Sequence, residues 1–159
     1  MKKFFLFYIL LFTVFSCQED VRFNNPAFQG MKDNVFWRAV QTTANVYSDG
    51  YLVIDAYTAT EVVTLQTNAT ALGTYYIGTT ATTTATYVYT NPQTKEKITF
   101  SSGFGVGDGQ IVITEYDSEN HTISGTFKFN LENTLNNPLA GPTLNYQYGV
   151  FYKIPVTLN

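Results

Sequence analysis

Apolar and polar residues alternate along most of the chain from about residue 35 onward. In segment 51–57, Leu52, Ile54 and Ala56 fall on one face and the residues between them on the other. Segment 122–129 repeats this pattern. A period of two is typical of a strand with one buried face, because successive side chains of a strand point to opposite sides.

Turn signals divide this alternating region into short pieces. Asp49-Gly50 stands between two alternating runs and predicts a hairpin, because glycine supplies the positive φ that such turns need. Asn91-Pro92 and residues 118–120 mark further turns. The pattern predicts one all-β domain of about nine strands, an antiparallel β-sandwich or a β-barrel-like meander in which mostly neighbouring strands pair. No amphipathic helix is evident, and the pattern does not choose between sandwich and barrel.

The first 16 residues have the pattern of an export signal. Two lysines precede an apolar run over residues 4–15, which is shorter than the about 20 residues that span a bilayer. Ser16 then precedes Cys17, the only cysteine, and this junction resembles the bacterial lipobox. We therefore expect residues 1–16 to be a lipoprotein signal peptide and Cys17 to carry lipid, although Phe15 is larger than that motif prefers. An ordinary signal peptide and an uncleaved anchor are the alternatives.

Residues 17–33 combine charge, Asn-Pro and glycine with little periodicity, so they are interpreted as the lipidated N-terminus and a tether. The all-β domain is then expected over 34–159. An acidic run, Gln18-Glu19-Asp20, resembles the signal that sends Bacteroidota lipoproteins to the outside of the outer membrane. The expected location is the outer membrane, exposed on the cell surface or facing the periplasm, with a merely solvated tether as the alternative interpretation of the acidic run.

Composition narrows the possible partners. The chain has nine Lys and Arg against 12 Asp and Glu, and two of the lysines belong to the expected leader. A nucleic-acid binder needs a basic face that neutralises phosphates, so nucleic acid is not an expected partner. The membrane, reached through lipid on Cys17, is the expected one.

Six segments of the expected domain, taken in order, carry a resemblance to a known family. They are Trp37 with Ala39, Gly73-Thr74-Tyr75, residues 109–114, residues 123–129, Gly149-Val150-Phe151 and Ile154-Pro155-Val156. Together they resemble a family of Bacteroidota lipoproteins described only as a domain of unknown function (DUF6252). The resemblance implies an exported β-rich lipoprotein without an assigned activity, and it supplies no catalytic or ligand residues.

Few residues offer catalytic chemistry. His121 is the only histidine and lies in an expected hairpin turn, where nothing would orient it or exclude water. Glu115 and Asp117 alternate and could form a carboxylate pair, but charges at a strand end also protect an edge from pairing. We expect no enzyme, with a hydrolase using Glu115 and Asp117 as the alternative. No metal site and no cofactor are expected.

Tyrosine is the one abundant residue type that suggests binding. Its flat amphipathic ring can stack on a sugar or anchor a protein contact, and it also fills sandwich cores. Candidate contacts are Tyr75, Tyr87, Tyr89 and Tyr116. The sequence thus favours a membrane-anchored, non-catalytic binding module for a glycan or an envelope protein, with a structural envelope component as the alternative.

Overall fold

The structure is a computed structural model that describes residues 27–159, so the expected leader and Cys17 lie outside the described residues. Strands and turns make up this range, and the all-β prediction is confirmed. No helix within residues 27–159 is long and apolar enough to cross a membrane. The strands are β1 (Ala27–Lys32), β2 (Val35–Arg38), β3 (Gln41–Val46), β4 (Leu52–Tyr57), β5 (Glu61–Thr67), β6 (Gly73–Ile77), β7 (Thr84–Thr90), β8 (Lys97–Ser101), β9 (Asp108–Asp117), β10 (Thr122–Glu132) and β11 (Thr143–Leu158).

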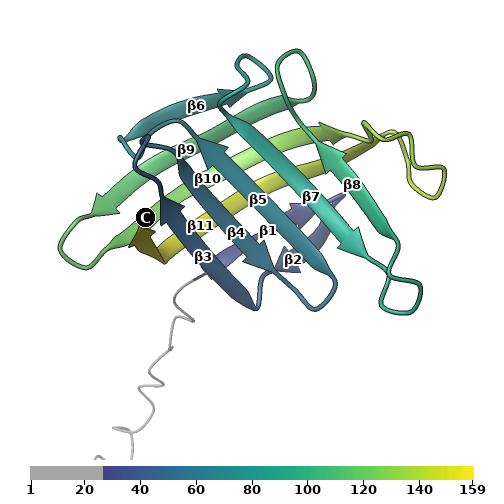
Figure 1. The fold of residues 1–159 in the computed structure, drawn as a ribbon, viewed down its shortest axis with the longest axis horizontal. Coiled ribbons are helices and arrows are strands. Elements are labelled where there is room, and N and C mark those ends of the chain that lie inside the picture. Colours follow the sequence, from purple (N-terminus) through teal and green to yellow (C-terminus); the bar gives the residue numbers. More distant parts are fainter. Residues whose placement is uncertain (1–26) are drawn as a thin grey trace, which may run out of the picture.

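The strands form two facing layers (Figure 1). One layer has the order β3-β4-β5-β7-β8, and the other has the order β2-β1-β11-β10-β9-β6. The layers are joined at two corners, because the end of β11 pairs with β3 and Glu132 of β10 pairs with Ser101 of β8. All eleven strands therefore belong to one sheet, and the β10–β11 pairing closes seven of them into a flattened ring, whose two sides are the layers of the sandwich.

The alternation seen in the sequence determines which face of each strand is buried. Leu52, Ile54 and Ala56 of β4 are each at most 1% exposed, while the residues between them are half-buried. Phe127 and Phe129 of β10 are likewise buried. The apolar faces of both layers thus meet in one core.

Four details differ from the expectation. The domain begins no later than Ala27, because β1 lies inside the segment that was expected to be tether. There are eleven strands in the described range, where about nine were expected. The β11–β3 pairing is parallel. Pairings such as β1–β11 and β6–β9 join strands far apart in sequence, so the meander is only partial.

Aromatic rings and glycines share the centre of the six-stranded layer. The rings of Phe28 and Phe127 lie 4.7 Å apart between centroids. A Cβ on Gly149 would lie 2.5 Å from the ring of Phe127, and a Cβ on Gly125 would lie 2.3 Å from the ring of Phe151. Glycine at these strand positions therefore makes room for rings that lie directly against the backbone.

Candidate functional site

The outer face of the six-stranded layer carries an open groove of about 490 Å³, which we call the Tyr148 groove. It crosses β9, β10 and β11. Its lining residues are Gln110, Thr126, Phe127, Lys128, Gln147, Tyr148, Gly149 and Val150.

A β-bulge in β11 creates this groove. Phe127 pairs with Gly149 and Phe129 pairs with Tyr146, so Lys128 alone faces both Gln147 and Tyr148. An extra residue of this kind bends a strand and redirects its side chains. The bulge turns Tyr148 outward beside Lys128.

Tyr148 combines strong exposure with an unfavourable backbone. Its side chain is 84% exposed, the largest value among the large hydrophobic residues of the described chain. Its φ is +53°, in the left-handed region that residues with a Cβ adopt at a cost of about 1 to 2 kcal/mol. Such strain persists only where the surrounding structure enforces it, and it is concentrated at functional sites.

A row of polar and aromatic side chains crosses the same face. Tyr76 of β6 pairs with Gln110 of β9, and Gln110 pairs with Lys128 of β10. Lys128 faces the bulge that holds Tyr148. We call these four residues, Tyr76, Gln110, Lys128 and Tyr148, the cross-strand row. The row has an exposed tyrosine at each end, since Tyr76 is 58% exposed and Tyr148 is 84% exposed.

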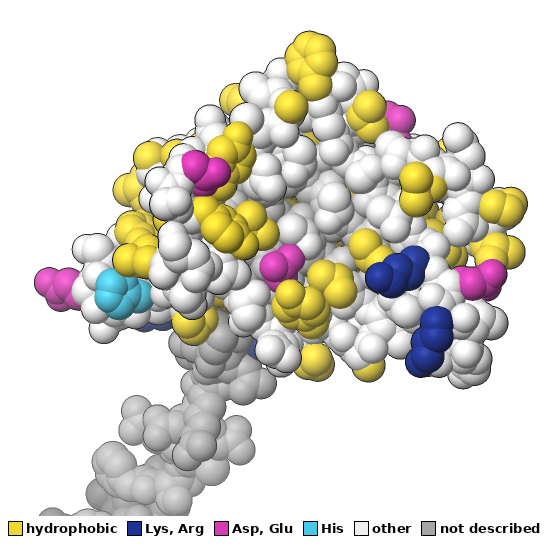
Figure 2. All heavy atoms as spheres, viewed as in Figure 1, with side chains coloured by type: hydrophobic (Ala, Val, Ile, Leu, Met, Phe, Trp, Pro, Cys, Tyr) yellow, Lys and Arg dark blue, Asp and Glu magenta, His cyan; other side chains and the backbone are white. Residues whose placement is uncertain are grey.

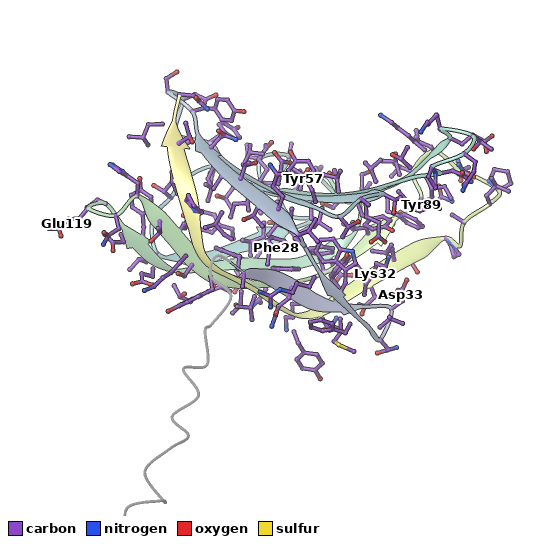
Figure 3. The ribbon with its side chains drawn as sticks, turned by 90° about the horizontal axis from the view of Figure 1, so that it is seen from below. Phe28, Lys32, Asp33, Tyr57, Tyr89 and Glu119 are labelled. Carbon is purple, nitrogen blue, oxygen red and sulfur yellow. The ribbon has the colours of Figure 1, made fainter. Side chains whose placement is uncertain are left out.

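A second polar group lies between the layers, centred on Glu61 of β5. The Glu61 carboxylate forms an ion pair with Lys32 of β1. It accepts hydrogen bonds from Trp37 Nε1 and the Tyr87 hydroxyl, both at 2.6 Å. Lys32 also lies 4.8 Å from the centroid of the Tyr87 ring. The group joins strands of both layers at one end of the sandwich, opposite the end that carries Glu119 (Figure 3).

The electrostatics of this group indicate a structural role. Burial raises the pKa of the Glu61 carboxyl, but hydrogen bonds from Lys32, Tyr87 and Trp37 and the charge of Lys32 outweigh burial and lower the pKa below 4.5. The pKa of Tyr87 is raised by burial and by Glu61. Glu61 therefore stays charged and fully bonded, and it has no proton to give near neutral pH.

The tyrosines singled out in the sequence do not gather on one surface. Tyr87 is 4% exposed and its hydroxyl donates to Glu61. Tyr75, Tyr89 and Tyr116 are partly buried and pack against the core. Tyr75 lies on β6 and Tyr89 on β7, which belong to different layers. These residues contribute to packing, whereas the exposed rings belong to other tyrosines.

Glu115 and Asp117 occupy the end of the β9–β10 hairpin. The Ser124 hydroxyl donates to Glu115 at 3.1 Å. Asp117 is partly exposed, and it accepts from the Asn120 amide side chain at 2.7 Å and from the backbone N–H groups of Glu119 and Asn120. Hydrogen bonds from Asn120 lower the pKa of Asp117. These bonds organise the turn, and neither carboxylate lines the Tyr148 groove.

His121 lies in the same turn with a φ of +50° and is exposed. Its backbone carbonyl accepts from Val156 N–H at 2.8 Å. In residues 27–159, no three His, Cys, Asp or Glu side chains come together in a way that could hold a metal ion.

A second hollow of about 390 Å³ lies in the loop between β10 and β11. The Asn133 side chain donates to the carbonyls of Asn137 and Gly141, and it accepts from Asn137 N–H. Because these amide atoms already hold the loop together, the hollow offers few free groups to a ligand.

The outer face of the five-stranded layer is mixed. Figure 2 shows hydrophobic atoms there in separate groups, with backbone, other side chains and a few charged groups between them. Thr64 of β5 pairs with Thr86 of β7, and Asp55 of β4 lies next in the row.

The sequence did not single out Tyr148, because strict alternation would place it on the same face as the buried Tyr146. From Tyr146 onward a strict period of two would assign Tyr146, Tyr148 and Val150 to one face, but Tyr146 is 0% exposed and Tyr148 is 84% exposed. The glycine after Tyr148 was the available signal, since an isolated glycine inside a strand often marks a bulge.

Comparison with known proteins identifies a family. A family model described as a domain of unknown function, DUF6252, matches residues 24–155. Comparisons with curated proteins and with solved structures gave no match. The matched range begins ahead of β1 and covers ten strands and most of β11. The chain therefore belongs to the DUF6252 family.

Proposed function

We propose that this protein is an envelope lipoprotein, anchored by lipid on Cys17, whose domain is a non-catalytic binding module. The anchor is supported by the apolar leader that ends in Ser16-Cys17. One acyl chain binds a membrane weakly, and two or more hold a protein almost permanently. The acidic run after Cys17 favours the outer membrane and the cell surface, with the periplasmic face as the alternative.

The single observation that carries the binding role is the geometry of Tyr148. A large ring is 84% exposed on a left-handed backbone, at the edge of a groove lined by amide, hydroxyl and ammonium groups. A structural component has no need to hold an unpacked ring at a cost in backbone energy. A binding role would explain why Tyr148 keeps this strained backbone, because the strain holds its ring where a ligand can contact it.

The absence of a catalytic role is supported by what the carboxylates already do. Glu61 is fully bonded between the layers, and Asp117 holds a turn. A general acid or base needs a proton that it can exchange with a substrate in a cleft. A hydrolase that would use Glu115 and Asp117 is therefore the less favoured of the two proposals, after the binding module.

The anchor is tested by metabolic labelling with a fatty-acid probe. We expect the natural protein to carry label and the Cys17→Ala variant to carry none. Label on the alanine variant would refute the anchor.

The binding role is tested by immobilising the whole protein and measuring how much material it retains from its own envelope. We expect Tyr148→Ala to lose most of this retention. Tyr47→Ala is the matched control, because Tyr47 is 44% exposed and lies outside the groove. Equal retention by all three proteins would favour a structural component.

A further inference from the structure

We propose that the Tyr148 groove binds an acidic oligosaccharide, one with uronate-type carboxylates, lying along the cross-strand row. This inference rests on the proposed binding function and names its ligand class.

The ring of Tyr148 offers a platform. Two χ angles limit its freedom, so little entropy is lost when a ligand packs against it. The ring is 84% exposed, so one face is free for the C–H groups of a sugar. A partner protein or a lipid surface would bury more apolar area, whereas Tyr148 and Val150 are the exposed large apolar side chains that line this groove.

The rest of the lining suits hydroxyl groups. Gln110 and Gln147 each provide an amide donor and an amide acceptor, and Thr126 provides a hydroxyl that does both. Sugar hydroxyls also donate and accept. Amides beside an aromatic ring therefore suit a carbohydrate, whose C–H groups pack on the ring while its hydroxyls bond to the amides.

Charge decides between a neutral and an acidic sugar. Lys128 is the one charged residue among the described residues that line the groove, and no carboxylate is among them. A single ammonium group in a groove without carboxylates attracts a ligand that carries negative charge, even though the formal net charge of the chain is −3. A carboxylate on the sugar can accept directly from the Lys128 ammonium.

The length of the row fits a short chain of sugars. Tyr76 and Tyr148 are three strand steps apart, or about 14 Å at about 4.8 Å per step. Gln110 and Lys128 lie between them. A short oligosaccharide can therefore stack on a tyrosine at each end while its polar groups meet Gln110 and Lys128 in the middle.

The test is calorimetric titration of the whole protein, purified from membranes in detergent, with oligogalacturonate and with oligoalginate. Fully methyl-esterified oligogalacturonate is the uncharged counterpart of the first probe. We expect binding of at least one acidic probe and weaker binding of the esterified form. Tyr148→Ala should weaken binding by about tenfold, and Tyr148→Phe, which keeps the ring, should change it by less than about threefold.

Lys128→Gln should remove the preference for the charged probe, so that the charged and esterified forms bind with equal affinity. Lys97→Gln and Tyr47→Ala are the controls, since both residues are exposed and outside the groove, and they should bind like the unmodified protein.

Three outcomes would overturn the inference: no binding of either acidic probe, binding unaffected by Tyr148→Ala and Lys128→Gln, or a Tyr148-dependent affinity for phosphatidylethanolamine and phosphatidylglycerol vesicles in place of the sugars. If envelope material is still retained through Tyr148 while the acidic probes do not bind, the ligand class is wrong and the binding function stands. If both fail, the proposed function fails with it.

Discussion

At the scale of single residues, Glu61 and Tyr148 show opposite uses of a polar or aromatic side chain. Glu61 is placed among donors from both layers, and every contact favours its charged form. Tyr148 is left exposed on a strained backbone. The first arrangement stabilises the fold, and the second exposes a ring at an energetic cost that packing does not recover.

Replacing Glu61 with Gln should destabilise the protein by about 1 to 3 kcal/mol, because Lys32 loses its counter-charge and is left among buried groups. Urea denaturation measures this change in the free energy of unfolding. Glu119→Gln is the control, since Glu119 lies exposed in a turn at the other end of the sandwich, and it should change stability by less than about 0.5 kcal/mol. Equal effects of the two substitutions would contradict the role of Glu61.

The lowered pKa of Glu61 predicts a pH dependence with a definite sign. The pKa of the folded state lies below the ordinary value of 4.5, so the unfolded chain takes up the proton first as the pH falls. Glu61 thus stabilises the fold above about pH 4.5, and this contribution is lost as the pH falls through the folded-state pKa. Urea midpoints measured from neutral to acidic pH should fall less steeply in Glu61→Gln. Parallel curves for the two proteins would disprove the prediction.

Tyr148→Asn separates stability from binding. Asparagine tolerates the left-handed region better than tyrosine, and the exposed ring of Tyr148 contributes little packing. The free energy of unfolding should stay equal or rise by up to about 1 kcal/mol, while retention of envelope material falls. A clear loss of stability in thermal denaturation would show that the ring supports the fold.

At the scale of elements, glycines decide how closely the strands of the six-stranded layer meet the core. In β1, Gly30 faces Gly149, and a Cβ there would lie 3.2 Å from the Gly149 Cα. In β10, Gly125 lies under the Phe151 ring. These glycines are part of the packing surface, although in a sequence they resemble breaks in a strand.

Gly125→Ala should be strongly destabilising, because its Cβ would lie 2.1 Å from the Val112 carbonyl oxygen, which belongs to backbone and cannot turn aside. We expect a loss of about 2 to 4 kcal/mol, seen as a lower urea midpoint. Gly141→Ala provides the comparison, since its nearest neighbour would be 4.0 Å away, and it should change stability by less than about 1 kcal/mol. A tolerated alanine at Gly125 would mean that β9 and β10 are less closely packed than described.

At the scale of the whole molecule, the two corners join the layers. Residues 156–158 of β11 leave the six-stranded layer and pair in parallel with Ala44, Asn45 and Val46 of β3. Through this pairing, the end of β11 is hydrogen-bonded to the five-stranded layer. The family match ends at residue 155, so the corner is formed beyond the matched range.

Deleting residues 156–159 should open this corner. Val156 is 9% exposed, and its loss together with the parallel pairing should cost about 2 to 4 kcal/mol. Hydrogen exchange should accelerate first in the amides of β3. Leu158→Ala is the milder control, because Leu158 is 61% exposed, and it should leave that exchange unchanged. Unchanged exchange in the truncated protein would mean that β3 is held by β4 alone.

Local pattern was sufficient for much of the fold. A period of two identified β4 and the inward face of β10, because the pleat requires alternation wherever one face is buried. The polar residues 118–120 also indicated the turn between β9 and β10. It could not show β1, whose Gly30 resembles a linker and is explained only by the facing Gly149.

The candidate site could not be predicted from the sequence, because its residues lie on strands that are far apart along the chain. Tyr87 and Tyr148 are equally plausible ligand contacts in a sequence, yet one is buried beside Glu61 and the other is exposed by a bulge. A tyrosine's role depends on which strands pack beside it, and pairings such as β1–β11 and β6–β9 join distant segments. The sequence by itself determined most of the strands, because a strand with one buried face follows from local periodicity. Only the tertiary structure decided the layers, the Glu61 contacts and the Tyr148 groove, because each requires a register between strands that are far apart along the chain.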